Sequence, residues 1–66
     1  MTEIRFNVTG DFVTKVTNEY GLFTWESLFE ILDCEFVEDF VDDYDHVMIL
    51  AFKSESDASA FVLRFL

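Results

Sequence analysis

The chain has 66 residues, and its 14 Asp and Glu against four Lys and Arg give it a formal net charge of −10. This length excludes a multidomain enzyme, so we expect residues 1–66 to form a single domain, and a content of 52% hydrophobic and 18% aromatic residues excludes intrinsic disorder. The surplus of acids excludes unassisted binding to nucleic acid or anionic lipid, because phosphate binding relies on Lys and Arg.

The first third of the chain predicts a strand and then a helix. Apolar and polar residues alternate across residues 3–8, which is the period-two pattern of a strand with one buried face. Gly10 interrupts this pattern. Apolar residues then recur at helical spacing over residues 12–20, and Gly21 supplies a stop for this helix.

The middle third predicts a helix, followed by a segment that fits two structures. Thr24 can cap a helix whose apolar stripe lies within residues 25–32. Residues 34–41 suit either a strand or a helix, and we favour the strand because residues 42–45 read as a polar connection to another apolar run. As a strand, the segment would place its apolar side chains on two faces: Cys34, Phe36 and Phe40 on one, Val37 and Val41 on the other. In the alternative, residues 25–41 form one long helix and the sheet has two strands.

The last third predicts a central strand and a closing helix. Residues 46–52 are almost continuously apolar, which is typical of a central strand with helices over at least one face. Ser54 can cap a helix that has acids in its first turn and apolar residues at helical spacing over residues 58–65. The whole order predicts an α+β fold, a small β-α-β-β-α layer in which a three-stranded antiparallel sheet packs against helices.

The aromatic residues of the middle segment offer more apolar area than so small a core can easily hide. They are Phe23, Trp25, Phe29, Phe36 and Phe40. We expect some of these rings to form an exposed patch for a partner or a second copy. Tyr20 and Tyr44 are the aromatic residues that we expect at the surface.

The C-terminal quarter of the chain carries a resemblance. From Phe52 to Phe65 the sequence reads aromatic-Lys-x-Glu-x-Asp-Ala-x-x-Phe-x-Leu-Arg-aromatic. This ending resembles the strand–cap–helix ending of many small bacteriophage proteins, which implies a phage or phage-like source. The pattern has a structural explanation, because Ala58 lets the helix approach the sheet while Phe61 and Phe65 reach the core. The resemblance therefore implies a fold and carries over no functional residue.

The acids of the middle segment are not balanced by cations. No Lys or Arg occurs between Lys15 and Lys53. Like charges at this density repel one another and destabilise the compact state, which favours a partner for the field. The alternative is an acidic, solvated surface on a small soluble protein. If all three lay on one helix, Glu26, Glu30 and Asp33 would be about 6 and 4.5 Å apart along its axis, close to the spacing of backbone phosphates. The candidate partner-binding residues are Glu26, Glu30, Asp33, Glu35, Glu38, Asp39, Asp42, Asp43 and Asp45, together with Tyr44.

These residues predict a non-catalytic protein that binds a basic nucleic-acid-binding protein of host or phage. By imitating DNA or RNA it would inhibit or modulate that partner, as an anti-restriction, anti-CRISPR or polymerase-modulating protein would. The alternative is a structural or assembly subunit that self-associates, for example as a homodimer, through its apolar sheet face or an edge strand. In that alternative the acids serve solubility alone.

We expect no catalytic, metal or cofactor site. Cys34 has acids on both sides and no cation to stabilise a thiolate, and a single Cys forms no internal disulfide. The acids before His46 lack the Gly and the closing Glu of a calcium loop, so we interpret His46 as a strand-edge residue. Without a signal-like start or an apolar run of ~18 residues, we expect a cytoplasmic protein with no membrane partner, in the host cytoplasm if it is phage-encoded.

Overall fold

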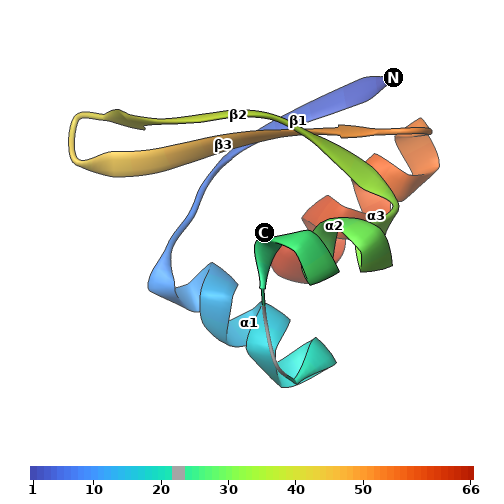
Figure 1. Cartoon of the computed structure of the whole chain (residues 1–66), viewed down its shortest axis with the longest axis horizontal. Coiled ribbons are helices and arrows are strands. Elements are labelled where there is room, and N and C mark those ends of the chain that lie inside the picture. Colours follow the sequence, from blue (N-terminus) through green and yellow to red (C-terminus); the bar gives the residue numbers. More distant parts are fainter. Residues whose placement is uncertain (22–23) are drawn as a thin grey trace.

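The computed structural model describes residues 1–21 and 24–66, and it forms two layers, a sheet and a set of helices that lie on one side of it (Figure 1). The elements follow the order β1 (Thr2–Asn7), α1 (Gly10–Tyr20), α2 (Trp25–Leu32), β2 (Cys34–Asp42), β3 (Asp45–Phe52) and α3 (Glu55–Phe65). The α+β fold expected from the sequence is confirmed, with two helices in the first helical region and a strand at residues 34–42.

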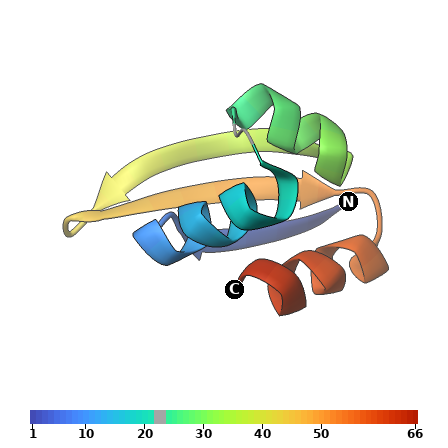
Figure 2. The ribbon, with the colours of Figure 1, turned by 90° about the horizontal axis from the view of Figure 1, so that it is seen from below.

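The sheet has the order β1-β3-β2, and both pairs of neighbours are antiparallel. The apolar strand β3 therefore lies in the centre, as its composition predicted, and Leu50 pairs with Ile4 on one side and Phe36 on the other. The β2–β3 hairpin extends beyond the helices at one end of the molecule (Figure 1). Seen from the helical side, α2 lies along β2 at one edge of the sheet and α3 along β1 at the other (Figure 2).

Each helix begins at a hydroxyl side chain. Thr9, Thr24 and Ser54 have extended backbones, and each side-chain oxygen accepts a hydrogen bond from the backbone N–H three residues later. Each cap satisfies one of the backbone N–H groups that the first turn of its helix leaves unpaired, and each contributes about 1 kcal/mol to the stability of the fold. Gly21 ends α1 with φ at 82°, a conformation that glycine adopts without a steric penalty.

The core between the sheet and the helices is built largely from phenylalanine rings. Phe12 of α1 lies at its centre and is 2% exposed. Its ring centroid is 5.0 Å from that of Phe6 and 6.0 Å from that of Phe61, in tilted and edge-on arrangements that aromatic pairs favour. Leu28 brings α2 into the same cluster. Residues from the first, middle and last thirds of the chain thus contribute to the apolar core that holds the helices to the sheet.

The expected face pattern of β2 is wrong in its second half. A β-bulge shifts the register between Phe36 and Glu38, so Phe36 faces the helices whereas Phe40 faces the opposite side of the sheet. There the guanidinium of Arg5 lies 5.2 Å from the centroid of the Phe40 ring. The extra residue of a bulge reverses the alternation of every side chain beyond it, which a strict period of two cannot anticipate.

The sheet face opposite the helices is partly covered by its own side chains. Val47 and Ala51 point to this side but are only 4% and 5% exposed. Side chains of the flanking strands close around them, including Arg5 and Phe40. Ile49 and Phe40 lie on the same side and are partly exposed, so the face keeps some accessible apolar area, and self-association through it stays a prediction.

Of the two tyrosines expected at the surface, Tyr44 is fully exposed and Tyr20 is not. Tyr20 packs partly into the core, with its ring 5.9 Å from that of Phe65 and the guanidinium of Arg64 at the same distance on another side. Phe23 lies outside the described residues. Among the described helices, none has the length and apolar character needed to cross a membrane.

Candidate acidic binding surface

The negative charge of the protein is concentrated in one segment. Residues 24–45 hold nine of the 14 acids and no Lys or Arg, which gives this segment a charge of −9. The other five acids share the rest of the chain with four Lys and Arg, which leaves −1. The segment forms α2, β2 and the turn into β3, so the charge belongs to one edge of the sheet and the helix beside it.

We call this region the acidic flank. It comprises Glu26, Glu30, Asp33, Glu35, Glu38, Asp39, Asp42, Asp43 and Asp45, and all nine are exposed. β2 is an edge strand and α2 lies alongside it (Figure 2), so the elements that carry these acids belong to the same edge of the molecule.

The acidic flank has two faces, because the edge strand presents acids on both sides of the sheet. Glu38 and Asp42 share the face opposite the helices with Arg5, whereas Asp39 pairs with Met48 and lies on the helical face. The sequence had not indicated this division, since it depends on the bulge. The flank is therefore a ridge with charges on either side.

The helical spacing expected for Glu26, Glu30 and Asp33 holds for the first two alone. Asp33 lies beyond α2 as its C-cap, in the left-handed conformation with φ at 53°. A carboxylate at a helix C-terminus opposes the helix dipole, and Lys53 offsets it with its Nζ atom 3.0 Å from Asp33 Oδ1.

Three acids of the flank are paired. Besides Asp33 with Lys53, the Nε2 atom of His46 lies 2.9 Å from Asp39 Oδ2, and a guanidinium nitrogen of Arg5 lies 3.8 Å from Asp42 Oδ2. All these pairs are solvent-exposed, so each contributes at most about 1 kcal/mol. Among the described residues, the other six acids have no cation within ion-pair distance.

The hairpin ends in a tight turn with an unusual backbone. Asp42 pairs with Asp45, so the loop has two residues, and both have positive φ, 51° at Asp43 and 75° at Tyr44. Two positive φ values define the type I′ turn, whose usual residues are Asn and Gly. Tyr44 occupies a position that favours glycine, and its side chain is 101% exposed among three Asp residues. The tip thus presents a ring that makes no contribution to the core.

Cys34 begins β2 and is half-buried beside the flank. Burial raises the pKa of its thiol to about 11, and the neighbouring carboxylate of Asp33 adds to the rise. The thiol is therefore mainly protonated at neutral pH, and the thiolate, which is the nucleophilic form, is a minor species.

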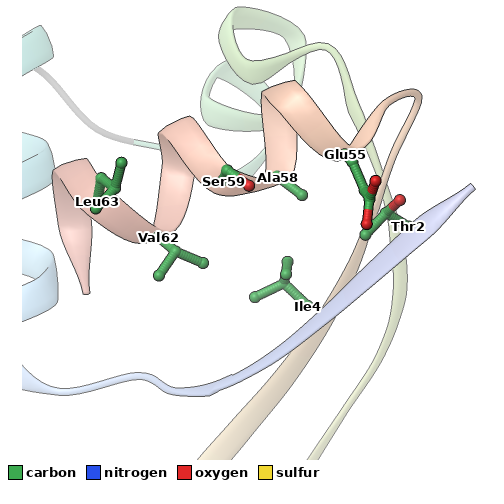
Figure 3. A pocket seen from close by; sticks show the side chains of 7 residues that line it. All are labelled: Thr2, Ile4, Glu55, Ala58, Ser59, Val62 and Leu63. Atoms are coloured by element: carbon green, nitrogen blue, oxygen red, sulfur yellow. The ribbon is translucent and has the colours of Figure 1, made fainter.

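The opposite edge of the molecule has a different character. A groove of about 450 Å³ lies between β1 and α3, and its lining is mainly apolar (Figure 3). Ile4 and Val62 point toward each other across it, while Glu55 and Thr2 lie at one end (Figure 3). Beside them Leu63 is 88% exposed.

Within residues 1–21 and 24–66, His, Cys, Asp and Glu side chains form no group of three or more that could hold a metal ion. No family model, curated protein or solved structure matches the chain.

Proposed function

We propose that the protein binds a basic nucleic-acid-binding protein through the acidic flank and occupies the site that DNA or RNA would take. The observation that carries this proposal is the concentration of −9 of the total charge of −10 in one flank of a small fold. A surface selected for solubility alone would gain as much from acids spread over every side, at a lower cost in self-repulsion.

The charge density supports the comparison with nucleic acid. The longest dimension of the molecule is 30 Å, and β2 and its hairpin run along it (Figure 1). Projected onto this length, the nine charges of α2, β2 and the turn average about one per 3.3 Å. This average is similar to one strand of B-DNA at about 3.4 Å per phosphate, although the acids occupy both faces of the flank and not one line. A basic groove would be attracted to the flank at long range, and its bound counterions would be released as they are by DNA.

Tyr44 extends the proposed contact at the hairpin tip. The exposed ring of Tyr44 can stack on an Arg guanidinium of the partner, while the surrounding carboxylates pair with other Lys and Arg side chains of the partner. The resemblance of the C-terminal pattern to phage proteins adds restriction enzymes, CRISPR effectors and polymerases to the partners to be tested. In each case inhibition would result from competition for one site.

Affinity capture tests the proposal. Tagged protein is incubated with bacterial lysate at about 50 mM and about 500 mM salt, and the captured proteins are identified by mass spectrometry. We expect nucleic-acid-binding proteins that are lost at the higher salt and are displaced by added DNA or RNA. Captured proteins that do not bind nucleic acid, or that added nucleic acid does not displace, would overturn the proposal.

A second candidate function is assembly through the opposite edge, and the groove beside Leu63 favours it. An apolar side chain that is 88% exposed next to an apolar groove is typical of a protein–protein contact. Sedimentation of the wild type and of Leu63→Ser tests this function. A homo-oligomer that the substitution dissociates would support it, whereas a monomeric wild type at about 100 μM would exclude a stable one.

A further inference from the structure

A small aromatic pocket opens on the helical side of the acidic flank. Its lining consists of Trp25, Phe29, Phe36, Asp39 and Met48, and its volume is about 250 Å³. This volume is below the range of about 300–1,000 Å³ that is usual for small-molecule and cofactor sites. The pocket is therefore of a size to hold one side chain of a partner.

The walls of the pocket are flat rings in nearly parallel orientation. The centroids of Trp25 and Phe29 are 6.0 Å apart with an interplanar angle of 28°, and those of Phe29 and Phe36 are 5.9 Å apart at 27°. On the inner side, the Trp25 ring stacks at 15° with Phe12, which is fixed in the core. This row of rings is preorganised, because its inner end cannot move without disturbing the core.

The outer end of the row remains accessible. Phe36 is 47% exposed although it faces the helices, whereas Met48 at the base of the pocket is 3% exposed. An exposed Phe above a buried apolar base leaves an apolar cavity that a partner side chain can fill with a gain in buried area.

Charge identifies the kind of side chain. Asp39 supplies a carboxylate to a lining whose other members are apolar, and its side chain is 46% exposed. Ring faces carry partial negative charge and attract cations, most strongly where the site is partly desolvated. The pocket belongs to a flank with a charge of −9, which excludes anionic ligands and concentrates cations.

We propose that this pocket receives an arginine side chain of the partner, with the guanidinium stacked against the rings and hydrogen-bonded to Asp39. His46 Nε2 already contacts Asp39 Oδ2 at 2.9 Å, and the second carboxylate oxygen can accept from the guanidinium. Arginine fits better than lysine, because its cation is planar, stacks on aromatic faces and is more weakly hydrated. This inference rests on the proposed function, since it names the residue type by which the basic partner is recognised.

The pocket can be tested without a partner. Trp25 is the only tryptophan of the chain, so intrinsic fluorescence reports on the pocket directly. Nα-acetyl-arginine amide is titrated into the protein, with the corresponding citrulline amide as the neutral isostere and Nα-acetyl-lysine amide as the second cation. The same titration followed by NMR locates the binding site.

A matched pair of variants separates the pocket from general charge. Asp39→Asn and Asp42→Asn each remove one carboxylate from β2 and one exposed ion pair, but Asp39 lines the pocket and Asp42 lies on the other face. Phe36→Leu and Phe40→Leu form a second pair, because each replaces one ring of β2 but only Phe36 lines the pocket, whereas Phe40 lies on the other face beside Arg5.

We expect roughly millimolar binding of the arginine amide, weaker binding of the lysine amide, and none of the citrulline amide. Asp39→Asn and Phe36→Leu should each weaken binding by about two- to fivefold, whereas Asp42→Asn and Phe40→Leu leave it within about 1.5-fold of the wild type. Equal effects of Asp39→Asn and Asp42→Asn, equal binding of the citrulline amide, or NMR shifts spread along the flank and absent from the pocket would overturn the inference.

Failure of the arginine pocket and failure of the proposed function give different results. Arginine binding in the pocket without any captured nucleic-acid-binding protein would refute the proposed function and leave the pocket as a cation site. Capture of such a protein by a variant with Phe36→Leu at wild-type strength would refute the pocket and leave the flank as the binding surface.

Discussion

Replacing Tyr44 by glycine should stabilise the protein. The φ of 75° at Tyr44 costs a non-glycine residue about 1–2 kcal/mol, and glycine avoids this cost. Glycine is more flexible in the unfolded chain, which takes back about 0.5–1 kcal/mol. Since the Tyr44 side chain is 101% exposed, its removal costs no packing in the fold. The net expectation is a gain of about 0–1.5 kcal/mol, and its midpoint of about 0.75 kcal/mol is equivalent to a rise in Tm of about 3–6 °C for a domain of this size.

Thermal unfolding followed by circular dichroism measures this gain, with Tyr44→Ala as the control. Alanine removes the ring but retains the strained backbone, so its Tm should lie within about 4 °C of the wild type. A Tyr44→Gly variant that melts at or below the wild-type temperature would refute the claim that the turn is strained. An equal gain in both variants would attribute the effect to the exposed ring. If the proposed contact at the tip is correct, both variants also bind the captured partner more weakly.

Three further predictions concern the core, the thiol and the charge. Leu28→Ala should lower the free energy of unfolding by about 2–5 kcal/mol in urea titrations, because Leu28 is 1% exposed and holds α2 to the sheet; a loss below about 1 kcal/mol would contradict this packing. Cys34 should react slowly with disulfide reagents at about pH 8 in the folded protein and rapidly in the unfolded protein, and fast reaction of the folded protein would contradict the burial of the thiol. Because burial raises the pKa of this thiol from 9.0 to about 11 in the fold, the free energy of unfolding should fall as pH rises through this interval. Raising the salt from about 10 mM to about 500 mM should increase Tm, since salt screens the repulsion within the acidic flank; a decrease would mean that its ion pairs outweigh that repulsion.

The sequence predicted the elements well because their signals are local. Thr24 and Ser54 precede apolar stripes of helical period, and Gly21 ends a helix at a positive φ, so each boundary depends on a few neighbouring residues. The central position of β3 followed from its continuous apolar run, which suits a strand with neighbours on both sides. A strand at residues 34–41 was predicted for a related reason, since the apolar run of β3 required a pairing partner, and the structure has it at Cys34–Asp42.

The details that the sequence did not predict depend on contacts between distant segments. The bulge before Glu38 is fixed by the register of β2 on β3 and leaves no Gly or Pro as a local sign. Tyr20 is half-buried because Arg64 and Phe65 of α3 lie over it. The run of acids was visible in the sequence, but its place on one flank depends on β2 being an edge strand. An exposed aromatic patch was expected from the sequence, and Phe36 is indeed 47% exposed. The pocket that three of these rings form with Asp39 and Met48 was not expected, since it joins α2, β2 and β3 across the fold.

A comparison of two variants with the same net charge tests the central claim most directly. One carries Glu30→Gln, Glu35→Gln and Glu38→Gln on the acidic flank, and the other carries Glu3→Gln, Asp11→Asn and Glu55→Gln elsewhere. Each removes three charges from −10 and so has a net charge of −7. Once circular dichroism shows that both are folded, the amount of nucleic-acid-binding protein that each captures from lysate is measured against the wild type. We predict that the flank variant loses most of the capture while the other retains it; equal capture by the two would show that net charge, and not the placement of the acids, determines binding.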